Sequence, residues 1–366
     1  MTIGRLQRNP RKRCDTQMLA CSDSWSSGYL AGMRIAITGA SGFVGSSLTR
    51  TLAASDHSIR CLDRVRNPGL DDLDLEWSTV DVLDRDQVRG ALDGIELVYH
   101  LAAVISVTGD PSGIVRRVNV DGVRNVAEAS LEAGVGRFVH CSSVHAFDLE
   151  AVDHLTEDGP KATDPNRPAY DLSKAAGEAE LHKVITHGLN AVIVNPTGIF
   201  GPRDHSQSRI NTMLLAMFAG RLPALVKGGF DWVDVRDVVS GIIAAGEKGR
   251  TGENYLLSGT HQTLRQLSEI AERVSGTPRP KVELPMWMAR MVTPLANVVS
   301  RRTKDPLWFT TESLHALRFD PTVSSAKAAA ELGYQSRSTE QSVSDIYEWA
   351  IEAGHVDGRG EGHNLR

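Results

Sequence analysis

The stretch from Arg34 to Gly45 reads RIAITGASGFVG, and it decides the fold. Its first five residues form a short, mostly apolar run of the kind found in buried parallel strands. Three glycines follow at G-x-x-G-x-x-G spacing, and a helical pattern begins within them. In such a turn glycine lets the backbone approach a pyrophosphate, and the helix N-terminus adds partial positive charge. A plain tight turn also fits three glycines. The residues predicted to bind the pyrophosphate are Gly39, Ser41, Gly42, Phe43, Val44 and Gly45.

Short apolar segments alternate with helical patterns along the chain. The strand-like segments are rich in β-branched or aromatic residues and lie at Ile59–Leu62, Ser78–Val80, Leu97–Leu101, Phe138–Cys141, Ala191–Val194 and Asn254–Leu257. Helical patterns lie at Phe43–Ala54, Val115–Glu132 and Tyr170–His187. This alternation predicts a parallel sheet covered on both faces. Right-handed crossovers then give the doubly wound α/β arrangement of a Rossmann fold.

The pattern changes near residue 200, which divides the chain into two expected domains. Residues 33–200, with the strand near 254–257, are predicted to bind the cofactor, and residues 201–354 mainly form a smaller substrate-binding lobe. This lobe is predicted to be mostly helical, at Arg209–Gly220, Val235–Glu247, Leu264–Val274, Ala326–Leu332 and Val343–Ala350. Its segment Met286–Val299 is rich in Met, Trp, Val and Ala. That segment fits either a cover over an apolar substrate or the core of the lobe.

Both ends of the chain are predicted to be tails, at residues 1–32 and 355–366. The first tail is rich in Arg and Ser, and its apolar residues keep no period. It fits a disordered extension, produced by a start upstream of Met33, or an organelle-targeting peptide. Asp15 and Asp23 count against the targeting peptide, because such peptides are poor in acidic residues.

Composition excludes several classes of protein. Of the 366 residues 41% are hydrophobic, and the formal net charge of −5 provides no basic field for nucleic acid. No apolar run approaches the roughly 20 residues that cross a bilayer. The cysteines show neither a CxxC spacing nor a histidine cluster, so we predict reduced thiols, no metal site and a cytoplasmic protein. They are Cys14, Cys21, Cys61 and Cys141.

The second predicted strand ends in a carboxylate that can select the cofactor. Asp63 lies 18 residues after Gly45, at the end of Ile59–Leu62. A carboxylate there accepts the hydroxyls of an adenosine ribose and repels a 2′-phosphate. Arg64 follows directly and suits a 2′-phosphate instead. We therefore predict NAD as the cofactor, with NADP as the alternative, although Asp63 by itself also fits a solvated turn.

Tyr170 and Lys174 form a Y-x-x-x-K pair at the start of a predicted helix. This spacing places both side chains on one helix face, after the strand that ends in Cys141-Ser142-Ser143. A phenol has a pKa near 10, and lowering it to about 7 requires roughly 4 kcal/mol of preferential stabilisation of its anion. A neighbouring ammonium and a positive nicotinamide ring can supply it, and a serine hydroxyl can hold the reacting oxygen.

Together these motifs resemble the extended short-chain dehydrogenase/reductase family, also called the NAD-dependent epimerase/dehydratase family. The resemblance runs from about Met33 to Gly354. Its motifs in chain order are TGASGFVG from Thr38, YHLAA from Tyr99, VNVDG from Val118, RFVHCSS from Arg137, YDLSK from Tyr170, NPTGIFGPRD from Asn195, WVDVRDVV from Trp232 and ELGY from Glu331.

The resemblance implies roles for individual residues. Ser143 would be the catalytic serine, Tyr170 the acid/base, and Lys174 its helper, which also holds the nicotinamide ribose. The other implied cofactor contacts are Asp81 and Val82 beside the adenine, Leu101, Ala102 and Ala103 along the cofactor, Asn119 in the next helix, and Pro196 and Thr197 near the nicotinamide amide. Asn119 also fits a role in helix packing, and Asp81 also fits a helix cap.

Two departures from the family pattern bear on the reaction. Asn195-Pro196 stands where many nucleotide-sugar members carry Arg-Pro, and Val144-His145 stands where sugar dehydratases carry Asp-Glu. The resemblance is therefore to the dihydroflavonol-reductase-like and hydroxysteroid-dehydrogenase-like branches. It implies hydride transfer between nicotinamide and a secondary alcohol or ketone. His145 would either contact this substrate or serve in ordinary packing.

Two other functions stay open at this point. A nucleotide-sugar epimerase would use the same transient oxidation and return the hydride to the other face of the sugar. A regulatory protein would bind the cofactor without turnover, which the intact set of Ser143, Tyr170 and Lys174 disfavours. The expected partner is a small-molecule substrate, and a homodimer is an open alternative to a monomer.

Overall fold

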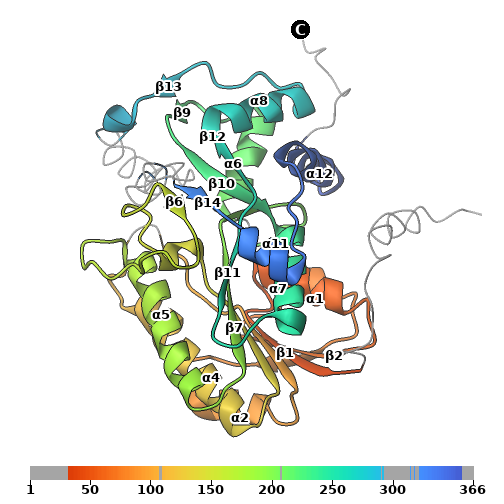
Figure 1. Ribbon diagram of the computed structural model, residues 1–366. Helices are drawn as coiled ribbons and strands as arrows, with labels where there is room; N and C mark the ends of the chain where they lie inside the picture. Colours follow the sequence, from red (N-terminus) through yellow and green to blue (C-terminus); the bar gives the residue numbers. More distant parts are fainter. Residues whose placement is uncertain are drawn as a thin grey trace, which may run out of the picture. The chain divides into compact units, whose positions relative to one another are not determined.

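Seven strands pair in one parallel sheet (Figure 1). The structure, a computed structural model, describes residues 32–106, 109–206, 208–289, 291, 314, 317 and 321–356. The strand order is β3-β2-β1-β4-β5-β7-β11, and every neighbouring pair is parallel. Their bounds are β1 Arg34–Thr38, β2 Ser58–Asp63, β3 Glu76–Thr79, β4 Leu97–His100, β5 Arg137–Cys141, β7 Ala191–Pro196 and β11 Asn254–Leu257. The predicted doubly wound α/β fold is confirmed.

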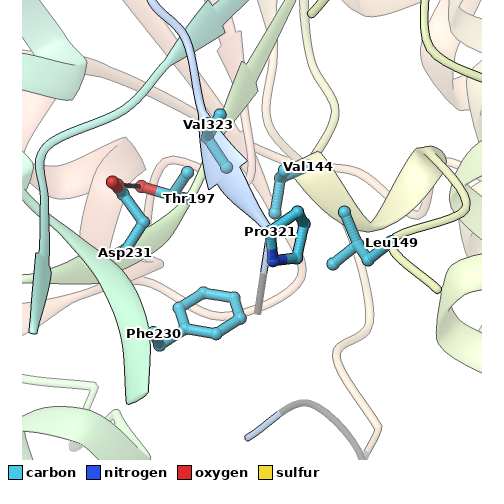
Figure 2. Close-up of a pocket in the computed structure, with 7 residues that line it drawn as sticks. All are labelled: Val144, Leu149, Thr197, Phe230, Asp231, Pro321 and Val323. Atoms are coloured by element: carbon cyan, nitrogen blue, oxygen red, sulfur yellow. Dashed lines mark hydrogen bonds between the residues drawn. The ribbon is translucent and has the colours of Figure 1, made fainter. Parts of the chain in front are cut away.

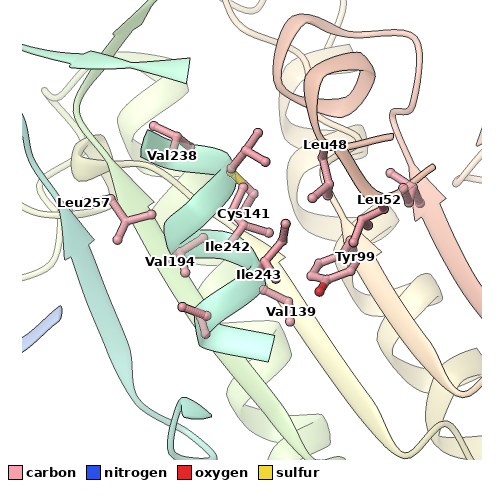
Figure 3. Close-up of a cluster of buried hydrophobic side chains, with 14 of the residues drawn as sticks. Leu48, Leu52, Tyr99, Val139, Cys141, Val194, Val238, Ile242, Ile243 and Leu257 are labelled. Carbon is pink, nitrogen blue, oxygen red and sulfur yellow. The ribbon is translucent and has the colours of Figure 1, made fainter. Parts of the chain in front are cut away.

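The two faces of this sheet bury separate apolar cores. Ile35 and Ile37 of β1 belong to one core and Ala36 to the other, because side chains alternate along a strand. Helices α1 and α7 pack on the first face (Figure 3), together with α11, and α2, α4 and α5 pack on the second. Their bounds are α1 Phe43–Leu52, α2 Arg85–Ala91, α4 Val123–Glu132, α5 Ala169–Thr186, α7 Val235–Lys248 and α11 Ala326–Leu332.

The strand order reverses beside β1, and this reversal positions the site. The chain builds β1, β2 and β3 outward in one direction and then returns to place β4 on the other side of β1. Connections at the carboxyl ends of β1 and β4 therefore diverge, which opens a crevice where ligands of such folds bind. The glycine turn follows β1 at this edge of the sheet.

The predicted helix Val115–Glu132 is one helical segment with an irregular middle. Ile114–Arg116 (α3) leads into a π-helical stretch, Arg117–Gly122, before α4 begins. Helix α5 packs closely on this stretch, since a Cβ on Gly177 would lie 2.2 Å from the backbone oxygen of Asn119. Such π-helical insertions are frequent at functional sites.

A second group of elements forms its own apolar core. Helices α6, α8 and α12 contribute to it, at Arg209–Phe218, Leu264–Ser275 and Thr339–Glu352. Helices were predicted in all three places. The small sheets beside them were not predicted: β8 Gly198–Phe200, β10 Gly229–Asp234 and β12 Thr260–Thr263 form a three-stranded sheet, β9 Leu225–Val226 pairs with β13 Glu283–Leu284, and β6 His154–Leu155 pairs with β14 Thr322–Val323.

Several predictions concern residues outside the described part of the chain. They are most of the tails at 1–32 and 355–366 and most of the segment Met286–Val299. The domain boundary near residue 200 stays a prediction. Across the described residues, every helix is too short or too polar to span a membrane.

Candidate active site

The glycine turn between β1 and α1 is shaped by two close backbone contacts. Gly39 has a φ of 70°, and a Cβ there would lie 2.7 Å from the backbone nitrogen of Ala102. A Cβ on Gly45 would lie 2.0 Å from the backbone oxygen of Gly39. Gly42 precedes α1 without a side-chain cap, so the first turn of α1 presents N–H groups that no capping side chain satisfies. This turn has the shape and partial charge that an anionic pyrophosphate requires.

Asp63 ties this turn to the end of β2. Its Oδ2 accepts a hydrogen bond from the backbone N–H of Ser41 at 3.0 Å, and its Oδ1 accepts one from the N–H of Arg64 at 2.7 Å. Oδ1 also accepts from the N–H of Val65 at 3.4 Å, whereas Oδ2 keeps a second lone pair that can accept a ribose hydroxyl. The Arg64 side chain is exposed, and Phe43 and Val44 open α1 beside the turn. The structure therefore brings together the residues predicted for the pyrophosphate and the ribose.

The residues predicted along the rest of the cofactor follow β3 and β4, the strands that flank the pair β2 and β1. The backbone nitrogens of Leu101 and Ala102 lie 3.2 Å and 3.3 Å from the Thr38 hydroxyl, to which they donate, and Ala103 is exposed. Asp81 follows β3 and accepts a hydrogen bond from the backbone of Leu83, while Val82 is buried. These residues lie on the same edge of the sheet as the glycine turn.

The buried side chain of Asn119 hydrogen-bonds both the loop after β4 and helix α5. Its side chain accepts from the backbone N–H of Val104 at 2.8 Å and donates to the backbone oxygen of Val104 and to the Ser173 hydroxyl, both at 2.9 Å. It is 1% exposed. These contacts fix the loop after β4 against helix α5, so Asn119 serves packing in this structure.

Ser143, Tyr170 and Lys174 converge from β5 and α5. Ser143 follows β5, its hydroxyl accepts a hydrogen bond from the backbone of His145, and its side chain is hydrogen-bonded to the Tyr170 phenol. The Lys174 ammonium lies 6.0 Å from the centroid of the Tyr170 ring and donates to the backbone oxygen of Cys141 at 3.3 Å. Lys174 is only 4% exposed. One hydroxyl, one phenol and one ammonium thus share a desolvated space.

Burial controls the charges of this cluster. Burial raises the pKa of the Tyr170 phenol well above its ordinary value, and the hydrogen bond from Ser143 offsets only part of that rise. Burial also lowers the pKa of the Lys174 ammonium. Behind them His100 and His140 stack at 5.3 Å, and burial with the Lys174 charge lowers the pKa of His100 to about 3. The protein groups alone therefore keep Tyr170 protonated and ready to donate a proton.

Comparison with known proteins places this site in a family. Residues 35–258 match the NAD dependent epimerase/dehydratase family. The chain is also 32% identical over 329 residues to sterol demethylase protein B of Methylococcus capsulatus, an alignment that covers 88% of this chain and all of that protein. The chain belongs to the NAD-dependent epimerase/dehydratase family. It is accordingly an enzyme of an NAD-dependent family.

Two further similarities cover nearly the same residues of this family member. A putative dihydroflavonol 4-reductase of Synechocystis is 28% identical over 341 residues, which are 87% of this chain and 95% of that protein. The crystal structure of gox2253 matches with a TM-score of 0.76 and 32% identity, over 89% of this chain and all of that one. The predicted resemblance to the family is confirmed.

A buried polar network behind Ser143 was not predicted from the sequence. Glu178 is 1% exposed and accepts hydrogen bonds from Asn195 at 2.6 Å, Asn254 at 3.1 Å and Lys161 at 2.6 Å. The Asn195 amide also donates to the backbone oxygen of Ser143 at 2.9 Å. Glu178 lies four residues after Lys174, on the same face of α5. Asn195, which stands where many nucleotide-sugar members carry Arg, therefore links Ser143 to helix α5 through Glu178.

A small pocket, with room for about one water molecule, is lined mostly by apolar side chains (Figure 2). Thr197, predicted near the nicotinamide amide, lines it directly after Pro196, and its hydroxyl donates to the Asp231 carboxylate at 2.6 Å. The backbone N–H of Gly259 donates to the same carboxylate oxygen at 2.7 Å. The pocket is lined by Val144, Leu149, Thr197, Phe230, Asp231, Pro321 and Val323. Val144 directly follows Ser143, so the pocket lining includes the chain neighbour of one predicted site residue.

Proposed function

We propose that this protein transfers a hydride between the nicotinamide of NAD and the carbinol carbon of a hydrophobic secondary alcohol or its ketone. The observation that carries the proposal is the cluster of Ser143, Tyr170 and Lys174, in which Ser143 and Lys174 are buried and the side chains around the neighbouring Val144 are mostly apolar. The family supplies the cofactor class, because its members are NAD-dependent.

The glycine turn fits the pyrophosphate of NAD. A Cβ would fill the space at Gly39 and at Gly45, and the uncapped N-terminus of α1 faces the same region. Asp63 would accept an adenosine ribose hydroxyl through the remaining lone pair of Oδ2, which favours NAD over NADP. Lys174 would hold the nicotinamide ribose, and Pro196 and Thr197 would lie by the amide. Bound NAD would supply the hydride acceptor and a positive charge close to the phenol.

Tyr170 moves the proton in this reaction. In oxidation its phenolate takes the hydroxyl proton while the C–H bond breaks and its electron pair leaves with the hydride. In reduction the neutral phenol returns that proton to the carbonyl oxygen. Ser143 holds the same oxygen through its hydroxyl, and the Lys174 charge stabilises the phenolate. Because burial raises the pKa of Tyr170, oxidation requires this added positive charge more than reduction does.

Three observations favour a hydrophobic substrate that undergoes net oxidation or reduction. The pocket beside Ser143 is lined mostly by apolar side chains. Val144 and His145 stand where the dehydratase pattern requires Asp-Glu. The relative from Methylococcus capsulatus is a sterol demethylase protein, and sterols are hydrophobic secondary alcohols.

The test follows the absorbance of reduced nicotinamide. The full chain is incubated with NAD and a panel of cyclic secondary alcohols, including sterols, and with UDP-sugars in a parallel series. We expect absorbance to rise in proportion to an added hydrophobic alcohol. Inversion of a UDP-sugar without net change in absorbance would establish an epimerase instead. Binding of NAD without turnover of either series would favour a regulatory protein.

A further inference from the structure

A second ionisable pair lies directly beside the proposed catalytic residues. His145 is the second residue after Ser143, in the 3₁₀ turn Val144–Ala146, and Asp171 follows Tyr170 at the start of α5. The Nδ1 atom of His145 lies 3.1 Å from Oδ1 of Asp171. The two side chains are 20% and 12% exposed, so their interaction is little screened by water. The proposed reaction as derived above uses neither residue.

The imidazole of His145 packs against the ring of Tyr170 and against Phe230, a residue that lines the apolar pocket. Its ring contacts the Tyr170 ring edge-on, with centroids 5.7 Å apart. It also stacks on Phe230 at 5.8 Å and 14°, and Phe230 lines the pocket. Because Nδ1 faces the Asp171 carboxylate, the opposite nitrogen Nε2 is the one that could meet a ligand. Burial lowers the pKa of His145, but the Asp171 charge overcomes that effect and raises it overall, which favours a proton on Nε2.

We propose that His145, oriented by Asp171, contacts the substrate and hydrogen-bonds a second oxygen close to the carbon that is oxidised or reduced. This inference rests on the proposed redox function and names its substrate class more closely. The preferred substrates are hydroxyketones, 1,2- or 1,3-diols and hydroxy acids, not simple ketones or alcohols. A ketone without a second oxygen would bury Nε2 without a hydrogen-bond partner, and the missing hydrogen bond would weaken binding.

The test compares a matched pair of ketones in the presence of reduced NAD. The probes are 2-hydroxycyclohexanone, which carries a second oxygen, and cyclohexanone, which does not. His145→Gln places an amide near the position of Nε2, whereas His145→Asn places one near Nδ1 and keeps a partner for Asp171. We expect wild type to favour the hydroxyketone in kcat/KM by about tenfold, the worth of one hydrogen bond. His145→Gln should keep most of that preference, and His145→Asn should lose it.

A purely structural role for His145 predicts the reverse result. In that case His145→Asn, which preserves the contact with Asp171, would keep the preference and His145→Gln would lose it. Equal preference in all three proteins would also overturn the inference.

A binding measurement separates this inference from the proposed reaction. The NAD complex is labelled with ¹⁵N-histidine, the His145 signals are assigned by their loss in His145→Gln, and each ketone is titrated in. We expect the hydroxyketone to shift Nε2 and cyclohexanone to leave it unchanged. A selective shift without turnover of either ketone would refute the redox function but support the contact between His145 Nε2 and the second oxygen. Absence of a selective shift overturns the contact, whatever the turnover.

Discussion

The glycine turn and the proposed catalytic cluster of Ser143, Tyr170 and Lys174 lie on the same sheet but are built in different ways. The turn is built from backbone, because Gly39 and Gly45 leave no room for a Cβ. The cluster is built from buried side chains, and Ser143 is held through Asn195, which reaches Glu178 on α5. A site built from backbone should fail when one carbon is added. A site built from side chains should tolerate changes of size but fail when one hydrogen bond is lost.

The largest effect should come from adding a carbon to the turn. In Gly45→Ala the new Cβ would overlap the Gly39 backbone oxygen, so the turn must shift away from the pyrophosphate. We expect NAD affinity to fall at least 100-fold, or about 3 kcal/mol, measured by calorimetry. Gly90→Ala in α2 is the control, because its Cβ meets nothing within 4 Å and should leave affinity unchanged. If Gly45→Ala folds and binds NAD normally, the glycine turn is not limited by its backbone contacts, and the contrast between a backbone-built and a side-chain-built site fails.

The second-largest effect on NAD affinity should come from the Asp63 carboxylate at the end of β2. Asp63→Ala removes the acceptor for Ser41 and the proposed acceptor for the ribose. We expect a loss of about tenfold in NAD affinity and a smaller gap between NAD and NADP, because hydrogen bonds to charged groups contribute about 1.5–3 kcal/mol. Titration of both cofactors measures this. Tighter binding of NADP than NAD by the unmodified protein would show that Arg64 decides the cofactor instead.

On the proposed catalytic side, loss of the buried hydrogen bonds of Asn195 should lower turnover without affecting the cofactor. Asn195→Leu keeps the size of the side chain but removes its hydrogen bonds with Glu178, the Ser143 carbonyl and Asn254. We expect kcat to fall about tenfold, as for a misplaced catalytic group, with NAD affinity unchanged. Asn166→Ala, on an exposed turn, serves as the control. An equal loss of NAD affinity would mean that the two sites are coupled.

The smallest expected effect is a shift in the pH profile. The hydrogen bond from Ser143 lowers the pKa of Tyr170, so Ser143→Ala should raise that pKa. The pH at which alcohol oxidation reaches half its maximum should therefore move upward by about one unit or less, since one unit corresponds to 1.36 kcal/mol. The pH dependence of kcat for oxidation in both proteins tests this. A shift to lower pH would contradict the arrangement of Ser143 and Tyr170.

The contrast between the two sites also explains what could be predicted from sequence. The strands of the main sheet and the glycine turn follow local patterns, so apolar runs and G-x-x-G-x-x-G spacing were enough to find them. The bond from Asn195 to Glu178 joins residues on separate elements, and no local pattern reports such a contact. The small sheets of β8, β9, β10, β12 and β13 were also not predicted, because all of these strands except β10 are only two to four residues long and none follows a clear alternation. Helix α2 was missed because Arg85–Ala91 is short and mostly polar, although Asp84 caps it.

The central claim is that the Tyr170 phenol moves the proton during hydride transfer, and one pair of variants tests it. Tyr170→Phe removes this hydroxyl, and Tyr99→Phe removes a buried hydroxyl in the core of β4, away from the proposed site. With an active alcohol in hand, the rate of nicotinamide reduction is measured at saturating NAD. The proposed mechanism predicts a loss of at least about 100-fold in Tyr170→Phe, with NAD still bound, and near-normal turnover in Tyr99→Phe. Near-normal turnover in a folded Tyr170→Phe protein would contradict it.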